Sequence, residues 1–144
     1  MAKKEKIIVY SNENCPYCKQ IKEKLTEEKI KFEEKQINEH EKDWANVTSL
    51  TGMPTVPTIY FKETYFVAGR DYMSPDHLIE IINNFEIVKH DLNELTIERI
   101  KTLNFSIAQA FQRLDASLRT LVDKIDNLNL QTKQLEENVD KSTD

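Results

Sequence analysis

Two cysteines, the only ones in this 144-residue chain, lie three positions apart in the run Cys15-Pro-Tyr-Cys18. The β-branched residues 6–11 before them predict a buried strand, and residues 16–29 after them predict an amphipathic helix with proline in its first turn. A helix start favours negative charge, so a thiol there ionises below its free pKa of about 8.5. The placement predicts Cys15 as the attacking thiolate and Cys18, one turn along, as the resolving thiol.

Two other uses of the cysteine pair stay open from the residues alone. A structural zinc ion usually takes four protein ligands, and the three histidines, His40, His77 and His90, are scattered with no paired spacing beside the cysteines. The pair could also be merely structural, although a secreted disulfide framework needs more cysteines at wider spacing. The pattern therefore favours redox chemistry, and no metal is expected.

The rest of the first 88 residues alternates strand and helix patterns. We expect a strand over residues 31–37, a helix over 39–50 that ends at Gly52, a hairpin of strands 58–61 and 65–67, and a last helix opened by Ser74-Pro75. This order predicts an α/β domain of βαβαββα type over residues 1–88.

Three ordered motifs make this domain resemble the glutaredoxins. They are the run from Tyr10 to Cys18 after a strand, Thr55-Val-Pro57 before another strand, and Ala68-Gly69-Arg70-Asp71 before the last helix. The resemblance implies a thioredoxin-like fold with a four-stranded mixed sheet. It also implies a cis Val56–Pro57 bond facing the cysteines, with the Val56 backbone free to pair with a bound thiol peptide as an added strand.

The same resemblance implies glutathione as a co-substrate and a disulfide-containing protein as substrate. The residues expected to bind them are Pro16, Tyr17, Lys19, Thr55, Val56, Pro57, Gly69, Arg70 and Asp71. Among these, Lys19 and Arg70 would supply positive charge, with a solvated role as an equal alternative for each. Asp71 would hold the γ-glutamyl amine of glutathione. A plain loop or helix cap is an equal alternative for Asp71.

The departures from the family pattern fall on glutathione-binding positions. Asn12 stands where members often carry Lys or Arg, and Pro54 stands where a basic or amide side chain often precedes Thr-Val-Pro. Tyr72 replaces the second acid of the glycine loop. These departures leave the disulfide chemistry intact and weaken the case for glutathione as the specific reductant. Iron–sulfur carriage is a third function in the family, but members dedicated to it usually have one cysteine, and Cys18 argues against it.

The second segment, residues 89–144, contains neither glycine nor proline, and its apolar residues repeat in one unbroken heptad frame. The a positions are Ile97, Asn104, Phe111, Leu118, Ile125, Thr132 and Val139, and the d positions are Ile100, Ile107, Leu114, Leu121, Leu128 and Leu135. This pattern predicts a long coiled-coil helix over residues 92–140, with Asp91-Leu-Asn-Glu94 as a capping box. Apolar residues at e and g positions favour a homo-trimer or mixed bundle over a dimer. The alternatives are a hetero-assembly, or two helices folded back on the domain.

Charge and hydropathy argue against nucleic-acid binding, membrane binding and secretion. The formal net charge of −5 is spread over both segments, so neither offers the basic field that nucleic acid or an anionic membrane needs. The apolar run at residues 7–10 is too short for a signal peptide or a membrane span, which predicts a cytoplasmic protein. The leading hypothesis is a thiol–disulfide oxidoreductase tethered to an oligomer or larger assembly by its C-terminal helix. The alternative is a structural or assembly protein, for example of a virus particle, in which the redox domain is a recruited module.

Overall fold

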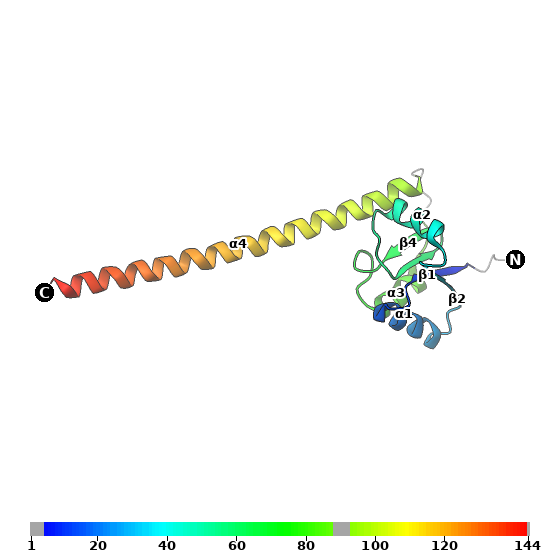
Figure 1. The fold of residues 1–144 in the computed structure, drawn as a ribbon, viewed down its shortest axis with the longest axis horizontal. Coiled ribbons are helices and arrows are strands. Elements are labelled where there is room, and N and C mark those ends of the chain that lie inside the picture. Colours follow the sequence, from blue (N-terminus) through cyan, green and yellow to red (C-terminus); the bar gives the residue numbers. More distant parts are fainter. Residues whose placement is uncertain (1–4, 88–92, 144) are drawn as a thin grey trace. The chain divides into compact units, whose positions relative to one another are not determined.

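The computed structural model describes residues 5–87 and 93–143 of the chain. In chain order the elements are β1 (Ile7–Ser11), α1 (Pro16–Glu27), β2 (Phe32–Gln36), α2 (Glu41–Thr51), β3 (Thr58–Phe61), β4 (Thr64–Val67), α3 (Pro75–Asn84) and α4 (Glu94–Ser142) (Figure 1). This order confirms the predicted βαβαββα unit followed by a long helix. The chain divides into two compact units between Asn104 and Phe105, so the first turns of α4 belong to the first unit.

The four strands form one mixed sheet, as the resemblance implied, and their order in it is β2-β1-β3-β4. The β1–β2 pair is parallel and is joined through α1, whereas β1–β3 and β3–β4 are antiparallel. Side chains of α1 and α3, such as Ile21 and Leu78, form the main core with Val9 and Ile59 of the central strands. Val47 of α2 belongs to a second cluster, with Tyr10 and Tyr65 of the sheet. The sheet is therefore packed between helices on both faces (Figure 1).

Local capping explains where several helices begin and end. Gly52 ends α2 in the left-handed conformation, with φ of 71°, as its position in the sequence predicted. The Ser74 hydroxyl caps α3 by accepting the His77 backbone N–H at 3.1 Å. At the start of α4 the cap is Asn93, whose side-chain oxygen accepts the Thr96 backbone N–H at 2.8 Å. The predicted capping box began two residues earlier, at Asp91, which lies outside the described residues.

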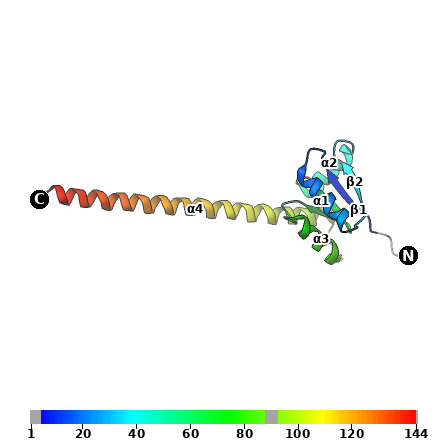
Figure 2. The ribbon, with the colours of Figure 1, turned by 90° about the horizontal axis from the view of Figure 1, so that it is seen from below.

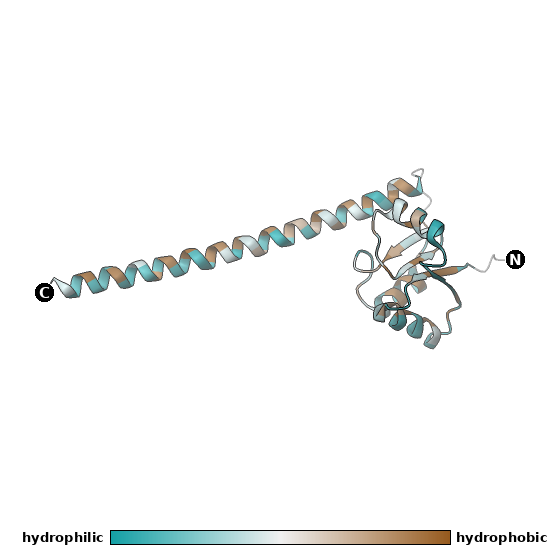
Figure 3. Cartoon of the chain, viewed as in Figure 1, coloured by the Kyte–Doolittle hydropathy of each residue, from teal (hydrophilic) through white to brown (hydrophobic). Residues whose placement is uncertain are grey.

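Helix α4 comprises 49 residues. It is drawn as one unbroken helix in Figure 2. This continuity excludes the alternative of two shorter helices. Within the second compact unit the d-position side chains remain exposed, from 45% for Ile107 to 65% for Leu135. Apolar and polar residues alternate along the helix (Figure 3), so the unit carries an apolar stripe that its own residues do not bury.

The first turns of α4 cover an edge of the sheet. Strand β4 is an edge strand, and the outward N–H of Tyr65 points to the Glu98 carboxylate at 3.4 Å. The Tyr65 carbonyl accepts hydrogen bonds from Lys101 at 2.6 Å and from Arg70 at 3.1 Å. An open edge is a template for pairing with other chains, and side chains close it here.

A buried ion pair stabilises the packing of α4 against the β4 edge of the sheet. The side chains of Arg70 and Glu98 are both 1% exposed, and their nearest nitrogen and oxygen lie 2.6 Å apart. Arg70 also donates to the Thr102 hydroxyl at 3.0 Å, and that hydroxyl donates to the Thr51 carbonyl at the end of α2. The pair therefore joins α4 to the loop after β4 and to α2.

Glu98→Gln should destabilise the N-terminal domain by about 3 kcal/mol, because it leaves a buried guanidinium without one of its two carboxylate partners. The free energy of unfolding can be measured in urea at one fixed protein concentration. The fluorescence of Trp44, the only tryptophan, reports on the domain. Glu137→Gln, on an exposed part of the same helix, is the matched control and should change the value by less than about 0.5 kcal/mol. Equal small effects of both substitutions would contradict a structural role for the ion pair.

Candidate redox site

Cys15 occupies the N-cap position of α1. Its backbone is extended, with φ of −100° and ψ of 104°, and its Sγ accepts the backbone N–H of Cys18 at 3.1 Å. Pro16 is the first helical residue, where a missing N–H costs nothing because that donor has no partner within the helix. The Cys15 sulfur therefore sits where the N–H groups at the start of the helix favour a negative charge.

The two cysteines form a disulfide, with Cα atoms 5.3 Å apart, and they differ in accessibility. Cys18 is 1% exposed, whereas Cys15 is half-buried. Cys15 is therefore the more accessible of the two cysteines, and their roles as attacking and resolving thiols stay a prediction.

The cis Val56–Pro57 bond is present and is held by a buried tyrosine. The Pro57 carbonyl accepts the Tyr72 hydroxyl at 2.9 Å and the Ala68 backbone N–H at 3.2 Å. Burial raises the pKa of the Tyr72 hydroxyl, which keeps it protonated as a donor. The Tyr72 ring also packs on the ring of Tyr17, with centroids 6.4 Å apart. Tyr17 lies between the two cysteines, so Tyr72 links the cis-proline turn to the cysteine helix.

The loop that follows β4 lies beside this site, and its charged residues bond within the protein. The Asp71 carboxylate accepts the Val67 backbone N–H at 2.7 Å and the Arg70 Nε–H at 2.9 Å. Gly69, with φ of 80°, supplies the left-handed turn. Lys101 of α4 approaches Asp71 at 3.8 Å, and burial lowers the pKa of the Lys101 ammonium although two carboxylates lie near it.

The remaining predicted binding residues are spread around the cysteines. Lys19 is exposed on α1, and its ammonium lies 3.9 Å from the Glu23 carboxylate. The Thr55 carbonyl accepts the Thr58 hydroxyl at 2.6 Å and closes the turn before β3. Val56 is half-buried, and no group within residues 5–87 or 93–143 hydrogen-bonds its N–H or carbonyl.

Two residues at the site were not predicted in their present roles. Tyr72 was seen only as a departure from the family pattern, although its hydroxyl holds the cis-proline turn. Glu98 drew no prediction from the sequence, because it lies outside the apolar stripe. Its burial depends on the packing of α4 against the sheet edge, which the local sequence pattern does not encode.

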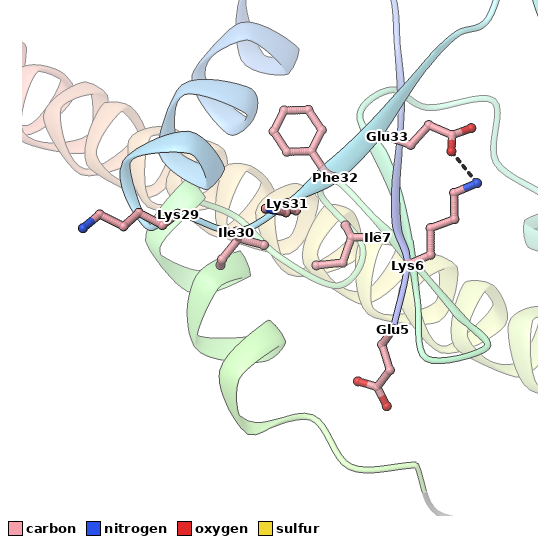
Figure 4. Close-up of a pocket in the computed structure, with 8 residues that line it drawn as sticks. All are labelled: Glu5, Lys6, Ile7, Lys29, Ile30, Lys31, Phe32 and Glu33. Atoms are coloured by element: carbon pink, nitrogen blue, oxygen red, sulfur yellow. Dashed lines mark ion pairs between the residues drawn. The ribbon is translucent and has the colours of Figure 1, made fainter. Parts of the chain in front are cut away.

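Other features of the described chain do not add to this site. No cluster of three or more His, Cys, Asp or Glu residues within the described ranges could hold a metal ion. Among the described helices, none is both long and apolar enough to cross a membrane. A hollow of about 650 Å³ lies at the start of β1, over Ile7, Ile30 and Phe32 (Figure 4). It lies at the opposite end of β1 from Cys15.

The geometry defines a domain of thioredoxin-like fold with a cysteine disulfide at the start of a helix, and a family model agrees with this class. Residues 7–66 match the glutaredoxin family model. This match covers under half of the chain and confirms the resemblance for these residues. None of the curated proteins compared with the chain matches it.

Similar solved structures include glutaredoxins from two very different sources. A glutaredoxin from Archaeoglobus fulgidus is 26% identical, with 56% of this chain and 89% of that chain covered and a TM-score of 0.47. A buckwheat glutaredoxin in complex with glutathione is 17% identical, with coverages of 56% and 70% and a TM-score of 0.43. The NrdH-redoxin of Escherichia coli is 18% identical, with coverages of 58% and 99% and a TM-score of 0.43.

We expect Cys15 to be the low-pKa thiol. Alkylation rates measured against pH on Cys18→Ser, which leaves Cys15, should level off well below pH 8.5, because the helix start stabilises the thiolate. The matched variant, Cys15→Ser, leaves a buried Cys18 and should react slowly at every pH. Ionisation of Cys18 alone in the acidic range would reverse the two roles.

Proposed function

We propose that the chain is a dithiol oxidoreductase that reduces disulfides in proteins, or glutathione mixed disulfides. One observation carries the proposal: the accessible Cys15 sulfur at the start of α1 accepts the backbone N–H of its buried partner, Cys18. The glutaredoxin domain over residues 7–66 supports the same class of chemistry.

The reaction needs only the two sulfurs and the substrate disulfide. The Cys15 thiolate attacks one substrate sulfur, forms a mixed disulfide and expels the other substrate sulfur as a thiolate. The expelled thiolate takes up a proton, and Cys18, after losing its own proton, attacks Cys15 and releases the second substrate thiol. Two electrons pass from the protein dithiol to the substrate, and the Cys15–Cys18 disulfide remains. An external dithiol, or two monothiols such as glutathione, must then reduce it.

The backbone beside the cis proline supports a peptide as the bound partner. The Val56 N–H and carbonyl have no hydrogen-bond partner among the described residues, so an extended peptide could pair with them as an added strand. A reducing compartment such as the cytoplasm suits this role, because the dithiol is the form that attacks.

Helix α4 supports a tethering role beside the redox role. Its apolar a and d positions are exposed from Ile100 onwards, and they include Leu114, Leu121 and Leu128. Burial of such a stripe is worth roughly 25 cal/mol per Å² of apolar surface, which drives association. We favour copies of the same chain, as a trimer or dimer, because the heptad frame runs unbroken and self-complementary along the helix.

Single-cysteine variants should separate an active oxidoreductase from a recruited structural module. Cys18→Ser should trap a mixed disulfide with a disulfide-containing protein, seen by mass spectrometry as the summed mass of both partners, because the resolving thiol is missing. Cys15→Ser should trap none and should reduce no disulfide. A parent chain that reduces no protein disulfide and no glutathione mixed disulfide would favour the structural alternative.

Sedimentation equilibrium should show the full chain as a dimer or trimer of the 16.9 kDa subunit. The double variant Leu114→Lys with Leu121→Lys puts charge into the stripe and should give a monomer. Gln112→Lys with Thr120→Lys adds the same charge on the polar face and should leave the oligomer intact. A parent chain that stays at 16.9 kDa at high micromolar concentration would contradict self-association.

A chain truncated after Asn104 should be a folded monomer, because it keeps the whole first compact unit. The domain expected from the sequence over residues 1–88 predicts that a chain ending at Glu86 also folds. It lacks Glu98 and Lys101, so it should unfold more readily than the longer fragment. Equal urea midpoints for the two fragments would show that the first turns of α4 add nothing to the domain.

A further inference from the structure

We infer that α4 makes this redox site recognise peptide thiols and disulfides, and not the γ-glutamyl group of glutathione. Glu98 and Lys101 act here as specificity-determining residues, because they complete a closed ionic cluster with Arg70 and Asp71. The inference rests on the proposed oxidoreductase function and names the substrate class of the same site.

The cluster lies where it can affect the substrate. Asp71 is followed directly by Tyr72, which packs on Tyr17 between the cysteines and bonds to the Pro57 carbonyl. The resemblance to glutaredoxins implies that Asp71 would hold the ammonium of the γ-glutamyl group. The availability of Asp71 therefore bears on whether glutathione is recognised.

The hydrogen bonds of Asp71 are made within the protein. Its Oδ2 atom takes the Val67 backbone N–H and two nitrogens of Arg70, at 2.7, 2.9 and 2.8 Å. Its Oδ1 atom lies 3.8 Å from the Lys101 ammonium, and only 13% of the side chain is exposed. A ligand ammonium would have to compete with two cations that are already in place.

Arg70 is equally unavailable to a ligand carboxylate. Its donors go to Asp71, to the Thr102 hydroxyl, to the Tyr65 carbonyl and to Glu98. The cluster holds two cations and two carboxylates, so its formal charge is zero. Lys101, at 25%, is its most exposed member. A zwitterionic γ-glutamyl group thus meets neither a free acid nor a free guanidinium here.

The features that a peptide would use remain open. The Cys15 sulfur is accessible, and the Val56 N–H and carbonyl have no partner in the parts of the chain that the structure describes. Pairing with a peptide backbone requires no charge from the 69–72 loop. The site therefore offers hydrogen-bonding groups to a peptide backbone, whereas the charged groups that could bind a γ-glutamyl group are paired within the protein.

The test uses the pre-reduced full-length chain in single turnovers, so that no external reductant enters the rate. One peptide carries its cysteine disulfide-bonded to glutathione. The same peptide, disulfide-bonded to N-acetylcysteinylglycine, is the comparison. That adduct keeps the amide and the glycine carboxylate of glutathione and lacks the γ-glutamyl charges. We expect second-order rate constants within about threefold of each other. A glutathione adduct that reacts tenfold faster or more would overturn the inference.

A variant gives an independent readout. Asp71→Asn should change both rate constants by the same factor, since Asp71 is not a ligand for either adduct. A selective loss with the glutathione adduct would show that Asp71 reads the γ-glutamyl group. Asp76→Asn, an exposed acid on α3, is the matched control and should leave both rates unchanged. If Asp71→Asn does not fold, the ratio of the two rate constants of the wild-type chain still tests the inference.

The two proposals fail in different ways. If neither adduct nor a protein disulfide reacts with Cys15, the oxidoreductase function fails, and this inference fails with it. If all three react and the glutathione adduct is favoured tenfold, only the inference fails.

Discussion

The Arg70 side chain is 1% exposed, and a guanidinium buried to this degree needs partners for its donors. Asp71 comes from the same loop, Tyr65 from the edge strand, and Glu98 and Thr102 from α4. One buried side chain thus joins three parts of the first compact unit. The redox domain is therefore complete only with the first turns of α4, which close the sheet edge and hold the loop beside the cysteines.

One face of α4 contacts the first domain, and another carries the exposed apolar stripe. The residues that contact the redox domain, among them Glu98, Arg99 and Thr102, lie off the apolar stripe, and Arg99 donates to the Ser49 carbonyl at 2.7 Å. The stripe itself is already exposed at Ile100. Packing against the domain consequently leaves the apolar stripe exposed from Ile100 onwards, where the association proposed above would use it.

The sequence was informative wherever a local pattern decides the structure. Strand and helix order, the cap at Ser74, the left-handed end at Gly52 and the position of Cys15 at a helix start all follow from residues close in the chain. The cluster around Arg70 could not be predicted in this way. Arg70 looked like a free cation beside the site, and its partner Glu98 is 28 residues away at a helix position that periodicity assigns to solvent. Only the packing of α4 on β4 brings them together.

The redox potential of the Cys15–Cys18 couple tests the central claim most directly, because it separates a catalytic dithiol from a structural disulfide. The full chain can be equilibrated with dithiol buffers of graded potential and its free thiols counted by mass after alkylation. An oxidoreductase should show one two-electron transition between about −180 and −270 mV, the range of disulfide-exchanging enzymes of this kind. A transition below about −300 mV, where structural disulfides lie, would contradict the account.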